Sequence, residues 1–131
     1  MQEQTISTFF MFNGRAEEAM NFYTSLFEGS EILHLHRQPN GKVLHAAFTL
    51  RGQPFMAIDN MLGIEHPFTP AMSLFVACET EEELRGAFGK LEDGGQALMP
   101  LGPIPGSTLF GWVQDRFGVS WQLSVPAAQT E

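Results

Sequence analysis

The chain has 131 residues, enough for one compact domain or two small, closely packed modules around a buried core. Its formal net charge of -8 disfavours contact with a phosphate backbone, so we expect no nucleic-acid partner. The sequence does not open with a basic segment and an apolar stretch, and no apolar run approaches the roughly 18 residues that span a bilayer. We therefore expect a soluble, cytoplasmic protein with no membrane partner.

The first half of the sequence predicts a strand, a helix and three further strands. The helix follows Asn13-Gly14, and its apolar residues recur at three- and four-residue spacings, which predicts one buried stripe that ends at Gly29. Turn signals at Pro39-Asn40-Gly41 and Arg51-Gly52 separate the later strands. The expected strands cover residues 5–12, 31–37, 43–50 and 54–59. The expected stripe consists of Ala16, Ala19, Met20, Tyr23 and Phe27.

The second half repeats this order of elements. Its helix begins at Thr80, and Glu83 completes a capping box, in which a hydroxyl and a carboxylate each satisfy a backbone amide. Gly94-Gly95 ends the helix. We expect Cys78, the single cysteine, to be a buried structural thiol in the first strand of this half. The strands are expected at residues 71–78, 97–99, 108–114 and 119–125, and the helical stripe at Leu84, Ala87, Phe88 and Leu91.

These elements predict an α+β protein made of two βαβββ modules. The modules cover about residues 1–60 and 70–126, joined by a linker at 61–69, within one domain of residues 1–131. Each should form a curved, mixed four-stranded sheet with a helix on its convex side. Four strands cannot close into a barrel. We therefore expect the two sheets to pair edge to edge around a concave cavity, within one chain or, as we favour, with completion across a homodimer.

The most informative segment runs from Phe110 to Leu123. It reads as a strand, a tight turn at Asp115–Gly118 and a second strand that alternates apolar and polar residues. This pattern resembles the signature Asp-x-Phe-Gly-x-x-Trp-x-Leu of the glyoxalase/bleomycin-resistance/dioxygenase, or vicinal oxygen chelate, superfamily. Segments 12–23, 45–48, 55–60 and 70–80 resemble, in order, those of PhnB-like proteins labelled 3-demethylubiquinone-9 3-methyltransferase-like. The resemblance implies a glyoxalase-like fold over nearly the whole chain.

The resemblance also implies where a metal would bind. Metal-dependent members place one ligand on the first and the last strand of each module, and these positions fall at about Thr8, Met56, Ser73 (or Met72) and Gln122. A divalent first-row metal prefers imidazole, carboxylate or thiolate ligands, and only the amide oxygen of Gln122, where glutamate is usual, is a passable substitute. We therefore predict no metal and no other cofactor, with a divalent metal as the disfavoured alternative.

Histidines elsewhere do not rebuild this site. His34 and His36 lie two apart on a predicted strand, so their side chains point the same way. They could form a weak metal clip at the surface, but solvated polar positions on a half-exposed strand are commoner. His66 is expected to be a loop residue of the linker.

His45 is the histidine best suited to a pocket. Residue alternation places His45 and Thr49 on the concave side of their strand. His45 is then either satisfied by a backbone carbonyl or water, or it binds a ligand or moves a proton. The apolar set that should face the helix is Leu44, Ala46, Phe48 and Leu50.

Alternation on the last two strands sends further polar groups to the same cavity. Gln122 should face the cavity, and Trp112 and Gln114 share one face of the preceding strand. Asp59, at the end of its strand, either orients a pocket group or forms a turn. Together the ligand-pocket candidates are Thr8, Phe10, His45, Thr49, Asp59, Ser73, Trp112, Gln114 and Gln122.

The function we favour is binding or sequestration of a small molecule by a protein with a degenerate metal site. The 12 phenylalanines and two tryptophans favour an apolar or aromatic ligand. The alternative is an enzyme of the same superfamily: a metal-assisted lyase, isomerase or dioxygenase, or the quinone methyltransferase that the family label suggests. Metal chemistry needs stronger ligands, and the segment Leu101–Gly106, with two prolines, is no glycine loop for a methyl donor. A purely structural or interaction protein is a third reading.

Overall fold

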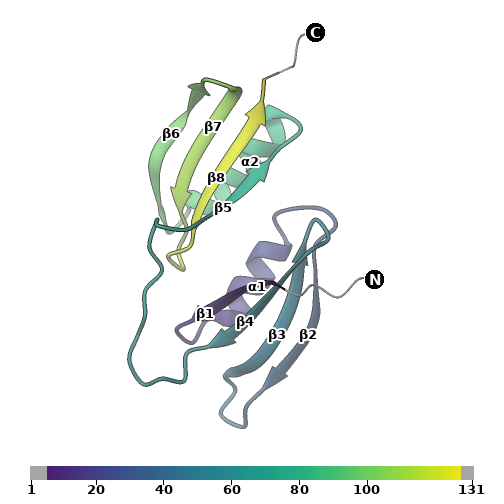
Figure 1. The fold of residues 1–131 in the computed structure, drawn as a ribbon, viewed down its shortest axis with the longest axis vertical. Coiled ribbons are helices and arrows are strands. Elements are labelled where there is room, and N and C mark those ends of the chain that lie inside the picture. Colours follow the sequence, from purple (N-terminus) through teal and green to yellow (C-terminus); the bar gives the residue numbers. More distant parts are fainter. Residues whose placement is uncertain (1–5, 128–131) are drawn as a thin grey trace. The chain divides into compact units, whose positions relative to one another are not determined.

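The computed structural model describes residues 6–127 and divides into two compact units, residues 1–66 and 67–131, here called module 1 and module 2 (Figure 1). Each has one helix and one four-stranded sheet in βαβββ order, which confirms the predicted α+β class. Module 1 contains β1 (Thr8–Phe12), α1 (Ala16–Thr24), β2 (Glu31–Arg37), β3 (Val43–Leu50) and β4 (Gln53–Asp59). Module 2 contains β5 (Ser73–Ala77), α2 (Glu81–Glu92), β6 (Gln96–Ile104), β7 (Ser107–Gln114) and β8 (Ser120–Pro126).

The two sheets have the same topology. Their strand orders are β1-β4-β3-β2 and β5-β8-β7-β6, and in each the first strand runs parallel to the last while the other pairs are antiparallel. The helix that joins the first two strands packs on one face of its own sheet. We call the other side of each sheet its open face. Within residues 6–127, no helix is long and apolar enough to cross a membrane.

The core of module 1 lies between α1 and the sheet and is rich in aromatic rings. Phe12, Tyr23 and Phe48 are fully buried, and the Tyr23 ring lies 6.3 Å from Phe12 and 6.5 Å from Phe48 between centroids. Burying each such side chain contributes roughly 1.5–3 kcal/mol. The helix ends at Thr24, five residues before Gly29, so the predicted length was wrong. Phe27 still joins the core, from the turn after the helix.

The core of module 2 is built in the same way around Trp121. The predicted helical stripe is confirmed, and Trp121 and Leu123 meet it from β8. The indole Nε1 of Trp121 donates to Asp115 Oδ2 at 2.9 Å, so its polar atom is satisfied inside the core. Cys78 is buried, as predicted, although it directly follows β5 instead of lying in it.

The two helices start in different ways. In α1 the first residue, Ala16, donates its amide to Asp59 Oδ1 at 2.9 Å, so a carboxylate from the end of β4 satisfies it. In α2 the predicted capping box is present: Glu83 N donates to Thr80 Oγ1 at 3.1 Å. The Glu83 carboxylate accepts from the amide of Glu79, one residue before the cap.

Strand β6 is longer than the sequence indicated. It covers Gln96–Ile104 instead of the predicted 97–99, and it includes Pro100 and Pro103. Proline lacks the amide hydrogen of a sheet ladder, so two prolines within one strand are unusual. The prolines are tolerated because β6 is an edge strand whose pairing with β7 is interrupted by register shifts.

Candidate functional site

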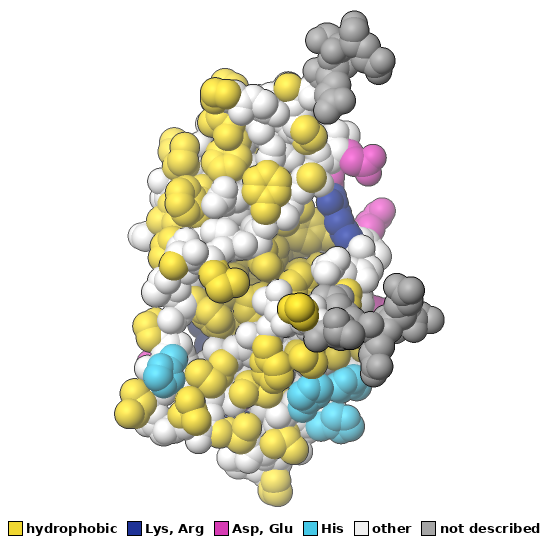
Figure 2. Space-filling model, in the orientation of Figure 1, with side chains coloured by type: hydrophobic (Ala, Val, Ile, Leu, Met, Phe, Trp, Pro, Cys, Tyr) yellow, Lys and Arg dark blue, Asp and Glu magenta, His cyan; other side chains and the backbone are white. Residues whose placement is uncertain are grey.

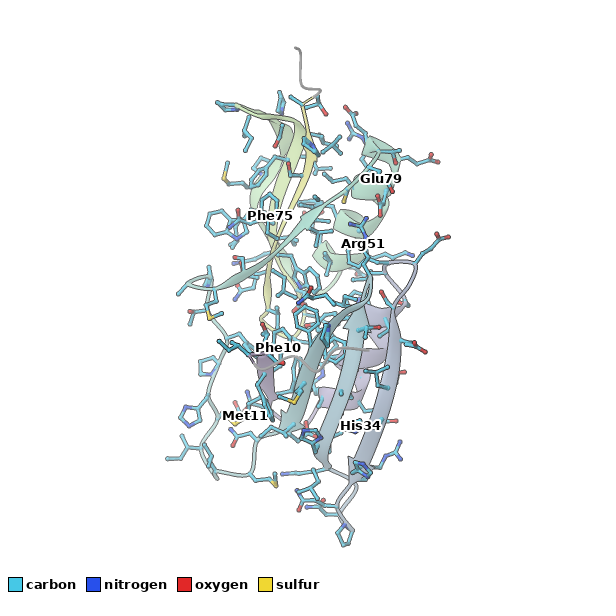
Figure 3. The ribbon with its side chains drawn as sticks, turned by 45° about the vertical axis from the view of Figure 1, so that its right-hand side comes forward. Phe10, Met11, His34, Arg51, Phe75 and Glu79 are labelled. Carbon is cyan, nitrogen blue, oxygen red and sulfur yellow. The ribbon has the colours of Figure 1, made fainter. Side chains whose placement is uncertain are left out.

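The open face of module 2 carries a row of four side chains, one from each strand. Gln122 on β8 pairs in register with Phe75 on β5 and with Trp112 on β7, and Trp112 pairs with Met99 on β6. Phe75 extends from β5 (Figure 3) and is 63% exposed, and Met99 is 40% exposed. Exposed apolar side chains therefore flank a half-buried indole and a carboxamide.

A hydroxyl network fixes the indole of this row. Trp112 Nε1 donates to Ser120 Oγ at 2.7 Å, and Ser120 Oγ lies 2.7 Å from Ser73 Oγ. Ser120 is almost fully buried, so the network has little freedom to move. The polar edge of the indole is thus already satisfied, which leaves the apolar part of this half-buried ring for contact on the open side.

The two glutamines of this face differ in availability. Gln114 Nε2 donates to the carbonyl of Gly118 at 3.0 Å and so is part of the β7–β8 turn. Gln122 makes no side-chain hydrogen bond within residues 6–127, although it lies between two aromatic residues. Its carboxamide carries two donors and one acceptor oxygen. Gln122 is thus the polar group of this row that can bind a ligand.

The corresponding row of module 1 has different chemistry. Phe9, Met56, Ala47 and His34 pair across β1, β4, β3 and β2. Figure 2 shows histidine side chains gathered in one patch on this module. His34 lies 5.1 Å from His45 and 5.2 Å from His36 between ring centroids. Within residues 6–127, no carbonyl or other group accepts a hydrogen bond from His45.

The pKa of His34 is lowered from its ordinary value. The largest cause is partial desolvation of the ring against the sheet, and the nearby His45 and His36 lower it further. His34 therefore stays neutral to a lower pH than an isolated histidine. A neutral imidazole keeps a lone pair on one ring nitrogen.

Thr8 and Phe10 are not on the open face, contrary to the prediction. Thr8 pairs with Phe55 on the side of β1 that also carries Phe10 and Phe12. Phe10 is buried and lies 5.9 Å from Phe55 between ring centroids (Figure 3). Since side chains alternate along a strand, an error of one residue reverses the face. Phe9 occupies the position that we had assigned to Phe10.

Asp59 also faces the helix side, and it has a structural role. Besides capping Ala16, its Oδ2 accepts the amide of Val43 at 2.9 Å, so it joins the starts of α1 and β3. Thr49 lies on the predicted face, but it is buried and its Oγ1 accepts from Glu31 N at 3.2 Å. Leu44, predicted to face the helix, is 50% exposed, because Val43 takes the core position next to a register shift.

Of the remaining candidates, the structure brings Ser73, Trp112, Gln114 and Gln122 together on one face, while His45 lies on the open face of the other module. Sequence reasoning missed Ser120, Phe75 and the position of His34 beside His45. Alternation from Gln122 would have found Ser120. The other two depend on strand order, which no local pattern contained.

The signature turn Asp115–Gly118 proves to be a folding element. Asp115 Oδ1 accepts the amides of Phe117 at 2.8 Å and Val119 at 3.0 Å, while Oδ2 accepts the indole of Trp121. Gly118 has a φ of 93°, which favours glycine. The aspartate, glycine and tryptophan of the pattern are therefore explained by one buried carboxylate and its turn.

A hollow of about 400 Å³ lies elsewhere on module 1 and contains none of the predicted pocket residues. Asn60 shapes its wall by donating to Asn13 Oδ1 at 2.9 Å and to the carbonyl of Ile64 at 2.7 Å. Its lining is Asn13, Gly14, Lys42, Asn60, Met61, Gly63, Ile64 and Glu65.

Within residues 6–127, no group of three or more His, Cys, Asp or Glu side chains is arranged to hold a metal ion as it stands.

Two proteins of solved structure match this chain over nearly its whole length. A Bacillus cereus PhnB protein, described as a candidate 3-demethylubiquinone-9 3-methyltransferase, is 55% identical with a TM-score of 0.89, over 93% of this chain and 99% of that one. A Pseudomonas aeruginosa protein is 27% identical with a TM-score of 0.81, over 95% and 98% of the two chains. No curated protein matches the sequence.

A glyoxylase/bleomycin resistance protein/dioxygenase domain from Frankia has the same fold. The two chains are 13% identical, with a TM-score of 0.71 over 98% of this chain and 96% of that one. The family model for 3-demethylubiquinone-9 3-methyltransferase matches residues 4–124, nearly the whole chain. The fold and this match together show that the chain belongs to the 3-demethylubiquinone-9 3-methyltransferase family, in its PhnB-like form.

Proposed function

We propose that the open face of module 2 binds a small, planar and largely apolar molecule. The observation that carries this proposal is the row of Phe75, Gln122 and Trp112, in which a carboxamide without a hydrogen-bond partner in residues 6–127 lies between two aromatic side chains. Aromatic rings bind planar ligands by offset or edge-to-face contact, and a few placed polar groups set orientation.

Preorganisation supports this face as a binding site. The Ser120 hydroxyl holds the Trp112 indole in place before any ligand arrives, so little side-chain freedom is lost on binding. Gln122 can donate to a ligand carbonyl or accept from a hydroxyl. A ligand with one polar edge and an apolar ring fits this combination better than a charged one, because the row contains no ionised group.

We further propose that the metal site of the chelating relatives is degenerate in this chain. The four inherited positions hold Thr8, Met56, Ser73 and Gln122, of which one offers a passable ligand atom. The side of β1 on which Thr8 lies supports this reading, because a residue directed towards the helix is not available to an ion on the open face. Binding at the row of module 2 then needs no metal.

The two tryptophans allow a direct test. The indole signal of Trp112, on the open face, and that of Trp121, in the core, are assigned in a ¹H–¹⁵N spectrum with Trp112→Phe. We expect 1,4-naphthoquinone to shift the Trp112 signal and leave Trp121 unchanged. Loss of a hydrogen bond worth about 1 kcal/mol predicts that Gln122→Ala weakens binding about fivefold.

Naphthalene, which lacks carbonyl oxygens, should bind wild type and Gln122→Ala equally. Gln53→Ala, an exposed glutamine of module 1, is the matched control and should bind the quinone as wild type does. Equal shifts of both indole signals, or unchanged quinone affinity in Gln122→Ala, would reject the site.

A further inference from the structure

Module 1 carries a cluster of histidines that the proposed function does not use. His34 and His36 lie on β2 with one residue between them, and His45 on β3 is the direct cross-strand partner of His36. We call His34, His36 and His45 the histidine cluster. Directly opposed residues of an antiparallel pair point to the same face, as do residues two apart on one strand. Backbone pairing therefore fixes three imidazoles on one side of the sheet.

The spacing of the rings suits a shared metal ion. An imidazole nitrogen binds zinc at about 2.1 Å, which puts the ring centre about 3.2 Å from the metal and two such centres about 5.2 Å apart at a tetrahedral angle. The observed centroid separations are 5.2 Å for His34 and His36 and 5.1 Å for His34 and His45. His34 is thus at the right distance from both other rings.

The rings are also available. Within residues 6–127, none of the three side chains makes a hydrogen bond, and His34 and His36 are exposed. The neighbouring cation, Arg37, is directed to Glu17 of α1 and paired with it, so it does not oppose a metal ion on the open face. The His34 and His45 rings now stack at 14°, and they must rotate to point nitrogens at one centre. His34 and His36 are exposed and can change rotamer readily, whereas His45 is half-buried, so most of the rotation must come from His34 and His36.

We propose that the histidine cluster binds one divalent first-row transition metal, such as zinc, through three imidazole nitrogens. The site forms by ring rotation on a backbone that already holds the three residues in place. Three histidine ligands leave a fourth tetrahedral position for water or another ligand. Imidazole favours zinc, copper and nickel over magnesium and calcium, which select oxygen ligands. This site is separate from the four positions inherited by the chelating relatives.

The test uses untagged, full-length protein stripped with a chelator. Cobalt(II) is titrated while its visible absorption is recorded, because tetrahedral cobalt absorbs far more strongly than octahedral cobalt, and zinc is then added as a competitor. Calorimetry with zinc gives the stoichiometry. We expect one ion per chain, intense cobalt bands that zinc removes, and affinity at least about tenfold weaker in each of His34→Ala, His36→Ala and His45→Ala.

His66→Ala is the matched control, because His66 is the remaining histidine and lies outside the cluster. It should bind zinc as wild type does, and circular dichroism should show all four variants folded. Absence of zinc binding to wild type, octahedral cobalt spectra, or equal loss in His66→Ala would each overturn the proposal. None of these results bears on the Gln122 test in module 2.

Discussion

Modules 1 and 2 share one topology but differ in how their helices and hairpins are anchored. Asp59 reaches α1 from a strand 43 residues away, whereas Thr80 caps α2 from the adjacent position. The hairpin β3–β4 turns on Arg51 and Gly52, both with positive φ, while Asp115 organises the turn of β7–β8 with its carboxylate. The same arrangement of elements is therefore stabilised once by distant contacts and once by local ones.

The open faces differ as well. At equivalent places in the two rows, module 1 has Met56 where module 2 has Gln122, and Ala47 where module 2 has Trp112. A repeated backbone thus carries unrelated side-chain chemistry. The fold therefore supplies equivalent positions in both modules, and function depends on the side chains that each module places there.

The largest effect should come from Asp115→Ala. It removes the acceptor of two buried amides and of the Trp121 indole, and leaving three donors without partners should cost about 4 kcal/mol of the free energy of unfolding. Both tryptophans lie in module 2, so urea unfolding followed by tryptophan fluorescence reports this loss. Asp93→Ala, at a side chain 82% exposed, is the control and should change stability by less than about 0.5 kcal/mol. Equal losses of unfolding free energy in Asp115→Ala and Asp93→Ala would mean that the Asp115 carboxylate does not anchor the turn.

Asp59→Ala should be the next largest and should act on module 1. Loss of the acceptor for Ala16 and Val43 should cost about 2 to 3 kcal/mol. Hydrogen exchange measured by mass spectrometry should show faster exchange in peptides of α1 and β3, with peptides of α2 unchanged. Faster exchange spread evenly over both modules would contradict a local anchor.

Thr80→Ala should have the smallest effect of the three. It removes one capping hydroxyl at an exposed helix start, which costs about 1 kcal/mol. We expect faster hydrogen exchange in the first turn of α2 only. The Thr80→Ser variant keeps a hydroxyl at this position and should exchange at the wild-type rate. A loss as large as that of Asp59→Ala would erase the difference between distant and local anchoring.

Local patterns explain how much of the fold could be predicted. The alternation of Trp121 and Gln122, the helical stripe of α2 and the Thr80 box are properties of neighbouring residues, and the structure confirms them. The role of Asp59 was open in the sequence, because its partner Ala16 is near it only after β4 has paired with β1.

The candidate site was harder to predict for the same reason. Trp112 and Gln122 follow from alternation, but Phe75 joins them only through the pairing of β5 with β8. The local sequence did not fix how β1 pairs with β4, so the wrong face was assigned to Phe10. The family resemblance identified the turn at Asp115 correctly. Only the structure shows that the buried carboxylate of Asp115 accepts hydrogen bonds from three donors.

The prolines of β6 also affect how this protein meets other chains. An edge strand with a complete set of amides invites an incoming strand to extend the sheet. Pro100 and Pro103 remove two donors from β6, and its register shifts bend what remains. Pro100 and Pro103 therefore disfavour extension of the sheet, and with it aggregation, through this edge.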